Sequence, residues 1–536
     1  MLSTIKIKTF FSLVSFLFDN IKMMTQTKTN WAKYNLGDKI ITSDLYLFNL
    51  NGIETFSEIA ELSVIKCRLE LIDELVYLIN LRKLTLSTNN ISHIEPIRDL
   101  IYLEMVDFNR NKINDIKPLA KLINLRILSL SDNQIEDVSI LSKLTRLTYL
   151  KISKNRIKLI ESFYGLTNLI SLDISFNQIK EIQFENLTKL NILDIENNFI
   201  QNVESIFNLN LITHLNCSDN NINYINFRRF NKLQELFAMN NNISNIDSIS
   251  VATGIEKLYL SSNQIENVKS IESLKKIKDL ILNNNKIKSI NFKKFEHLEL
   301  VDLSNNLLTD IESLSGLEFL KKVNFSNNKI ESNTNKSMIS SSKIYQIDLR
   351  NNCLTSFIFN SKIKRFVLLD LSFNRLKSLT ITNYFQVVYL YLNDNLLSDI
   401  SQLNNVSCSN ILDISNNNFE IDNLSKTRVF SLMRKVNLSE NPIKNLSGIE
   451  NLSQLKMIYL SSNQIDLFQN IINSRVKELR KEFYESLFIN SIQTIIYDDN
   501  FCEKIIYLLK KNNLHLNLCS PEQIDYFLKN CPLSST

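Results

Sequence analysis

One motif is repeated along most of this chain and restricts the folds that it can adopt. Residues 258–274, LYLSSNQIENVKSIESL, place apolar side chains at fixed intervals around one asparagine, Asn263. The first and last of the repeated asparagines are 374 residues and 17 repeats apart, a mean of 22.0 residues. A period of this length indicates coils that stack into a solenoid. The repeated asparagines are Asn89, Asn111, Asn133, Asn155, Asn177, Asn198, Asn220, Asn241, Asn263, Asn285, Asn306, Asn328, Asn352, Asn374, Asn395, Asn417, Asn441 and Asn463.

The alternation of side chains identifies the strand of each coil. In Leu258-Tyr259-Leu260 the leucines point to one side and enter the core, while the tyrosine faces out. One coil cannot bury its leucines alone, but stacked coils can. A coil with Cys67 in the asparagine slot precedes Asn89 and brings the count to 19. The predicted fold class is an α/β solenoid, with a curved parallel sheet on the concave face, short helical or 3-10 segments on the convex face, and terminal caps.

The asparagine of each coil has a predicted structural role. The turn after the strand is buried, and its backbone N–H and C=O groups have no partner in a strand ladder. An amide side chain supplies both a donor and an acceptor for such groups. We therefore expect the asparagines to form a structural ladder, with Cys67 as a poorer substitute in its coil.

With these motifs the coils resemble the short, 22-residue class of leucine-rich repeats, similar to those in the regulatory subunit of type-1 protein phosphatase and in bacterial internalins. The resemblance covers roughly residues 62–468. It implies an interaction scaffold that binds a partner protein on its concave face, with regulation as one use. It does not identify the partner, because the class serves many unrelated ones. The alternative is a host-directed effector or surface protein of the internalin type.

Composition and cysteine spacing bear on the class of partner and on the compartment. The net charge of +5 over 536 residues is too dilute for binding to nucleic acid, which requires a concentrated basic stripe. The seven cysteines include no C-x-x-C pair, so we expect reduced thiols and neither a metal nor a cofactor. We expect a cytoplasmic monomer that does not bind membranes, with secretion or delivery to a host cell as the alternative.

The two ends of the chain lie outside the repeats. The apolar run TFFSLVSFLF is long enough for a signal-peptide core but too short to cross a bilayer. We favour a non-native extension upstream of a start at Met23 or Met24, and a targeting segment is the other interpretation. Trp31 is assigned to a cap over the first strand edge. The expected parts are residues 1–22, an apolar extension or targeting segment; 23–58, an N-terminal cap; 59–468, the solenoid; and 469–536, a C-terminal α/β cap or small domain.

The sequence does not predict an enzyme. Its four histidines are scattered along the chain, and it has neither a Gly-rich phosphate loop nor a nucleophile elbow. His214 is expected on the concave sheet near Asp219, an arrangement that is common on ordinary surfaces. The competing hypothesis is an enzyme whose activity lies in the C-terminal segment, residues 469–536.

A partner is expected on the concave sheet, at the outward position between the two core residues of each strand. Along most coils this position is polar, with seven aspartates and one lysine. Phe237, Tyr259 and Ile281 interrupt it on three consecutive coils. An apolar patch with a charged border is typical of a binding hot spot, although such side chains also cover one another in ordinary surfaces. The predicted contacts are Phe237, Met239, Tyr259 and Ile281, bordered by Glu235, Lys257 and Asp279, and the next column to test is Leu368, Tyr389 and Ile411.

Overall fold

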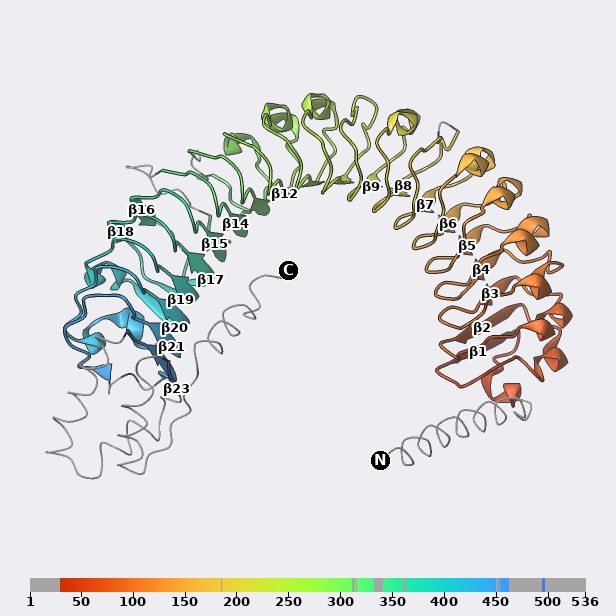
Figure 1. Ribbon diagram of the computed structural model, residues 1–536, viewed down its shortest axis with the longest axis horizontal. Helices are drawn as coiled ribbons and strands as arrows, with labels where there is room; N and C mark the ends of the chain where they lie inside the picture. Colours follow the sequence, from red (N-terminus) through yellow and green to blue (C-terminus); the bar gives the residue numbers. More distant parts are fainter. Residues whose placement is uncertain are drawn as a thin grey trace, which may run out of the picture. The chain divides into compact units, whose positions relative to one another are not determined.

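The chain winds into stacked coils that form two compact units, Met1–Ile255 and Glu256–Thr536. The computed structural model describes residues 29–184, 186–310, 314, 316–331, 341–359, 363–449, 452, 454–461 and 494–496. In each unit, parallel strands line the inner side of the coils and short 3-10 helices lie on the outer side (Figure 1). The predicted α/β solenoid is therefore confirmed.

The strands of the first unit pair in parallel, in the register that the repeat predicts. The core residue of one coil stands opposite the core residue of the next, as Leu84 does to Val106 and Leu128 to Leu150. All four side chains are fully buried, so the stack of coils supplies the core that no single coil has. The strands are β1 (Lys39–Ser43), β2 (Glu61–Ile65), β3 (Lys83–Thr85), β4 (Met105–Asp107), β5 (Ile127–Ser129), β6 (Tyr149–Lys151), β7 (Ser171–Asp173), β8 (Ile192–Asp194), β9 (His214–Asn216) and β10 (Glu235–Phe237).

The second unit repeats this arrangement with one local change. Most of its strands are three residues long, but β17, β19 and β20 extend to six, seven and eight residues. On the other side of the same coils, β16 and β18 form a separate two-stranded parallel sheet. The strands are β11 (Lys257–Tyr259), β12 (Asp279–Ile281), β13 (Leu300–Asp302), β14 (Lys322–Asn324), β15 (Gln346–Asp348), β16 (Ser356–Phe359), β17 (Arg365–Asp370), β18 (Ser378–Ile381), β19 (Phe385–Tyr391), β20 (Val406–Asp413), β21 (Lys435–Asn437), β22 (Met457–Tyr459) and β23 (Thr494–Ile496).

The outer helices are 3-10 rather than α-helices because the apolar residues there recur every third position. Val268, Ile271, Leu274 and Ile277 are all buried, and each of the last three donates its N–H to the carbonyl three residues earlier. A three-residue turn keeps such side chains on one face. In the first unit the 3-10 helices are η1 (Trp31–Tyr34), η2 (Ile53–Phe56), η3 (Asp73–Tyr77), η4 (Glu95–Ile97), η5 (Lys117–Lys121), η6 (Ser139–Lys143), η7 (Glu161–Gly165), η8 (Glu204–Asn208) and η9 (Asp247–Val251). In the second they are η10 (Lys269–Ser273), η11 (Phe292–Lys294), η12 (Ile400–Leu403), η13 (Leu424–Lys426) and η14 (Arg428–Phe430).

The N-terminal segment expected as a cap contains both a helix and a strand. Trp31 is buried in η1, and its indole N–H donates to the carbonyl oxygen of Asn51 at 3.1 Å. Strand β1 pairs with β2 over five residues and so covers the edge of β2. Residues 1–22 lie outside the described residues, as does the C-terminal segment 469–536 apart from β23, which pairs with β22.

Candidate protein-binding surfaces

The repeated asparagines connect each coil to the one before it. Asn374 Oδ1 accepts the Leu354 N–H at 3.1 Å, and its Nδ2 donates to the carbonyl oxygens of Leu349, Leu371 and Ser372 at 3.0, 3.1 and 3.0 Å. The bonds to Leu354 and Leu349 connect Asn374 to residues 20 and 25 positions earlier in the chain. The bonds to Leu371 and Ser372 lie within its own turn. The ladder thus holds the strand face of neighbouring coils in fixed register.

Most positions of the ladder have this environment. Asn133 is half-buried and the other described asparagines of the ladder are buried, while Asn463 lies outside the described residues. In the coil that has Cys67, the thiol donates to the Ile65 carbonyl at 3.2 Å, and Asn89 Oδ1 accepts the Cys67 N–H at 2.9 Å. The next asparagine therefore supports the coil that lacks its own.

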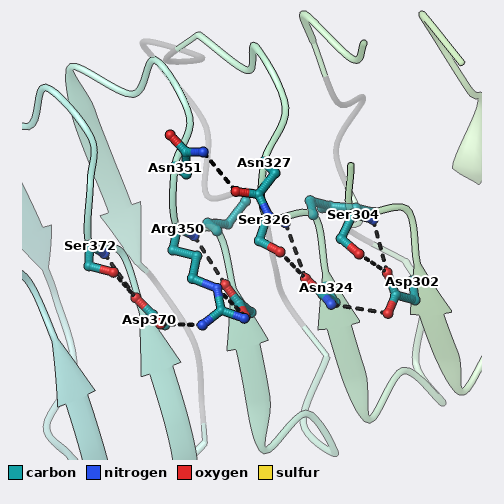
Figure 2. A network of polar contacts seen from close by, with 12 residues as sticks. Asp302, Ser304, Asn324, Ser326, Asn327, Arg350, Asn351, Asp370 and Ser372 are labelled. Carbon is teal, nitrogen blue, oxygen red and sulfur yellow. Dashed lines mark hydrogen bonds and ion pairs between the residues drawn. The ribbon is translucent and has the colours of Figure 1, made fainter. Parts of the chain in front are cut away.

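The outward aspartates of the second unit have a local structural role. Oδ1 of Asp302 accepts both the N–H and the hydroxyl of Ser304, at 2.9 and 2.7 Å, and Asp370 binds Ser372 in the same way (Figure 2). An aspartate that accepts from the residue two positions on stabilises a turn at the strand end. The frequent Asp-x-Ser pattern is therefore more than a device for solubility.

Two of these aspartates are packed side by side and shielded from water. Asp348 stands opposite Asp370 in the pairing of β15 with β17, and their side chains are 8% and 9% exposed. Arg350 lies between them, with Nε 3.3 Å from Asp348 Oδ2 and Nη1 4.0 Å from Asp370 Oδ2. Burial, and to a smaller extent the nearby Asp370, raise the pKa of Asp348 to about 7, although Arg350 acts to lower it. Burial also raises the pKa of Asp370 and of Asp413.

An apolar row begins on β17, two residues before Asp370, and continues across β19 and β20. Leu368 stands opposite Tyr389, and Tyr389 stands opposite Ile411. Leu368 is buried, with 5% of its surface exposed, and Tyr389 and Ile411 are half-buried. This face carries large apolar groups in contact with solvent, which is typical of a contact surface for another protein.

The strands under this apolar row are held rigidly. The rings of Phe359, Phe366 and Phe385 are buried, and their centroids are 5.2 Å apart in all three pairs. Strand β20 has one residue more than β19 between two paired positions, which makes a β-bulge. The thiol of Cys408 donates to the carbonyl oxygen of Ile411 at 3.0 Å beside this bulge. Burial raises the pKa of Cys408 to about 12, so this thiol remains protonated.

The contacts predicted from the sequence are divided between the two units. Glu235 and Phe237 lie in β10 of the first unit, Met239 follows two residues later, and all three are half-buried. In the second unit, Tyr259 of β11 stands opposite Ile281 of β12. These two apolar side chains are therefore neighbours on one strand face, as expected for part of the predicted patch.

The charged border of the predicted patch takes part in internal contacts. Lys257 stands opposite Asp279 in the pairing of β11 with β12. The hydroxyl of Tyr259 donates to Oδ2 of Asp279 at 3.1 Å, so this carboxylate orients the ring. In the first unit, His214 Nε2 is 3.8 Å from Glu235 Oε2, and its Nδ1 is 2.7 Å from the Thr213 hydroxyl.

The sequence analysis missed the long strands of the second unit. Their signal is a run of apolar, β-branched and aromatic residues longer than the usual three-residue strand, as in RFVLLD and FQVVYLY. The run SFIF of β16 is likewise mostly apolar and aromatic. In the described part of the chain no cluster of His, Cys, Asp or Glu has the arrangement of a metal site, and no described helix combines the length and apolarity of a membrane span.

Comparisons with known proteins identify the class of this fold. A family model for two copies of the leucine-rich repeat matches residues 123–165, and a second leucine-rich-repeat model matches residues 145–200. A search of curated protein sequences found no match.

Several solved structures are similar. An internalin from Listeria monocytogenes is 26% identical, with 58% of this chain and 95% of that chain covered and a TM-score of 0.54. A plant peptide hormone receptor, RGFR1 in complex with RGF2, is 20% identical, with 82% and 78% covered and a TM-score of 0.65. A leucine-rich-repeat protein of Leptospira interrogans is 20% identical, with 65% and 94% covered and a TM-score of 0.52.

The coils, their register and these matches define a solenoid of leucine-rich repeats. The prediction of a leucine-rich-repeat array, made from the 22-residue period, is confirmed. Internalins are among the proteins whose structures it resembles, as the sequence indicated.

Proposed function

We propose that this chain is a protein-protein interaction scaffold whose partner docks on the strand face of the second unit. The observation that carries the proposal is the row formed by Leu368, Tyr389 and Ile411, which sets apolar side chains on paired strands beside the buried carboxylates. Rigid strands position contact groups more accurately than loops do. Two of the similar structures are a plant peptide hormone receptor, RGFR1, in complex with RGF2, and PEPR1-AtPEP1.

The residues predicted from the sequence remain part of this proposal. Tyr259 and Ile281 form a second candidate contact on the same strand face of the second unit. Phe237 and Met239 are candidate contacts on the strand face of the first unit. Each group is tested by its own alanine variant.

We further propose a cytoplasmic location and a monomeric chain without enzymatic activity. The free thiols of Cys67, Cys217, Cys353 and Cys408 support a reducing compartment. Secretion or delivery to a host cell is the alternative location. The competing hypothesis of an enzyme places its activity in segment 469–536, nearly all of which lies outside the described residues.

The experiment compares matched tyrosines on two surfaces. The partner is captured from the native cell with the full chain, identified by mass spectrometry, and its dissociation constant is measured for Tyr389→Ala, Tyr259→Ala and Phe237→Ala. Tyr164→Ala is the control, because Tyr164 is 65% exposed in η7 on the outer side. A central aromatic anchor contributes about 2 kcal/mol or more, so its loss weakens binding about 30-fold.

Two outcomes are decisive for this proposal. Weakened binding in Tyr389→Ala or Tyr259→Ala, with unchanged binding in Tyr164→Ala, supports docking on the strand face of the second unit. Equal binding by both strand-face variants and wild type refutes it. A loss confined to Phe237→Ala moves the site to the first unit.

A further inference from the structure

The negative charge of the aspartate row is not required by the turn that each aspartate stabilises. Asn324 Oδ1 accepts the N–H and hydroxyl of Ser326 at 3.1 and 2.8 Å, just as Asp370 accepts those of Ser372 (Figure 2). The amide of Asn437 binds Ser439 in the same way. An amide oxygen and a carboxylate oxygen are therefore interchangeable in this turn.

The negative charge of Asp348 and Asp370 is also destabilising at these positions. Asp348 and Asp370 are opposite one another on adjacent strands, each more than nine-tenths buried, and both like charge and loss of water disfavour their ionised forms. Asp370 Oδ2 accepts no hydrogen bond from the described residues, and the nearest cation is Arg350 Nη1 at 4.0 Å. One guanidinium thus serves two carboxylates, and the carboxylate of Asp370 has an oxygen left for a further donor.

The same strands place apolar groups beside this charge. Leu368 and Asp370 are two residues apart on β17, a separation of about 6.6 Å along a strand, and adjacent strands lie about 4.8 Å apart. Tyr389 and Ile411 continue the apolar row, and Asp413 continues the acidic row on β20. The apolar row crosses all three paired strands, whereas the acidic row is interrupted on β19, where Tyr391 stands between Asp370 and Asp413. We call them together the 368–413 surface, made of Leu368, Tyr389, Ile411, Asp348, Asp370 and Asp413.

We infer that the 368–413 surface binds an extended segment of the partner protein that sets a lysine or arginine against Asp370 and an adjacent apolar side chain against Leu368, Tyr389 and Ile411. Charge complementarity identifies this occupant, because a cation supplies the donor that Asp370 lacks and offsets the repulsion between the carboxylates. The apolar row supplies affinity beyond that of a single ion pair. The inference rests on the proposed function and adds the chemistry of the partner to it.

Random twelve-residue peptides displayed on phage are the probe, selected on the full chain with elution by salt and by low pH. Because the whole chain has a net charge of +5, basic peptides are not attracted to it as a whole. We expect the enriched peptides to contain Lys or Arg next to an apolar residue. Synthetic copies should bind Asp370→Asn at least tenfold more weakly than wild type and Tyr389→Ala at least tenfold more weakly.

The control variant is Asp302→Asn, which makes the same change in the same type of turn on β13, away from the apolar row. It should change affinity less than twofold, and thermal unfolding should show that both Asn variants fold like wild type. Peptides that depend on Tyr389 but are neutral or acidic, or that bind Asp370→Asn as tightly as wild type, would overturn the inferred chemistry and leave the proposed surface standing. Selection that yields no peptide dependent on Tyr389 would overturn the inference as a whole, and the proposed docking face would then be decided by the Tyr259→Ala measurement.

Discussion

Replacing Asn155 by alanine measures how much one rung of the asparagine ladder stabilises the first unit. Its Oδ1 accepts the Ile135 N–H at 2.9 Å, and Nδ2 donates to the carbonyl oxygens of Leu130, Ile152 and Ser153. Alanine removes all four bonds, but these oxygens also accept from Asn133 Nδ2, Asn177 Nδ2 and the Asp132 N–H. Only the Ile135 N–H is left without a partner, and one buried orphan costs about 1–3 kcal/mol.

Asn89 should be the more sensitive position. Its Oδ1 accepts two N–H groups, those of Cys67 at 2.9 Å and Leu69 at 3.1 Å, because the preceding coil has a cysteine in the asparagine slot. Asn89→Ala leaves both without an acceptor, so it should cost about 2–6 kcal/mol. Fraying near a chain end predicts the opposite order, since Asn89 lies closer to the N-terminus than Asn155.

The assay is urea unfolding of the full chain, followed by far-UV circular dichroism, with the midpoint and slope compared among wild type and both variants. We expect midpoints in the order wild type, Asn155→Ala, Asn89→Ala, from highest to lowest. Equal urea midpoints for all three proteins, or a lower midpoint for Asn155→Ala than for Asn89→Ala, would refute the argument that the number of unpaired N–H groups sets the loss of stability.

Three further predictions concern the second unit. The pKa of Asp348 is about 7 in the folded chain and ordinarily 3.8, so the folded chain binds more protons than the unfolded chain between these pH values. The free energy of unfolding should therefore fall as the pH rises from about 4 to 7. In Asp348→Asn the urea midpoint should fall less over this pH range. Cys408, whose pKa burial raises to about 12, should react with a thiol reagent at neutral pH only after unfolding, and reaction at the unfolded rate in the native chain would contradict its burial. Phe373 has a φ of 52° and is 54% exposed, so Phe373→Asn should stabilise the chain by about 1 kcal/mol, and a lower melting temperature would show that its ring has packing we have not counted.

The sequence predicts the fold well because every repeat carries the same physical requirements. Asn263 and its equivalents mark each buried turn, and the three-residue spacing of Val268 and Ile271 continues on the outer side. The position of each strand follows from two core residues that flank one outward residue, such as a tyrosine, isoleucine or aspartate. A repeated local pattern needs no knowledge of distant contacts, since each coil contacts mainly its neighbours.

The candidate site was predictable only in part. The sequence places Tyr259 beside Ile281, and it names the column with Tyr389, but it does not reveal that Asp348 and Asp370 share one arginine. The burial and the pKa of these two aspartates depend on how the side chains of neighbouring coils pack against one another. The turn made by Asp370 with Ser372 was not predicted, because a hydrogen bond from the backbone N–H two residues later to a side chain leaves only a weak sequence signal.

The most direct test of the proposed docking surface is site-specific photocrosslinking in the native cell. The variants Tyr389→p-benzoylphenylalanine and Tyr164→p-benzoylphenylalanine are irradiated side by side, and crosslinked peptides are identified by mass spectrometry. The account predicts an adduct at position 389, absent at position 164, on a partner segment that contains Lys or Arg beside an apolar residue. An adduct at position 164 without one at position 389 would contradict docking on the strand face of the second unit.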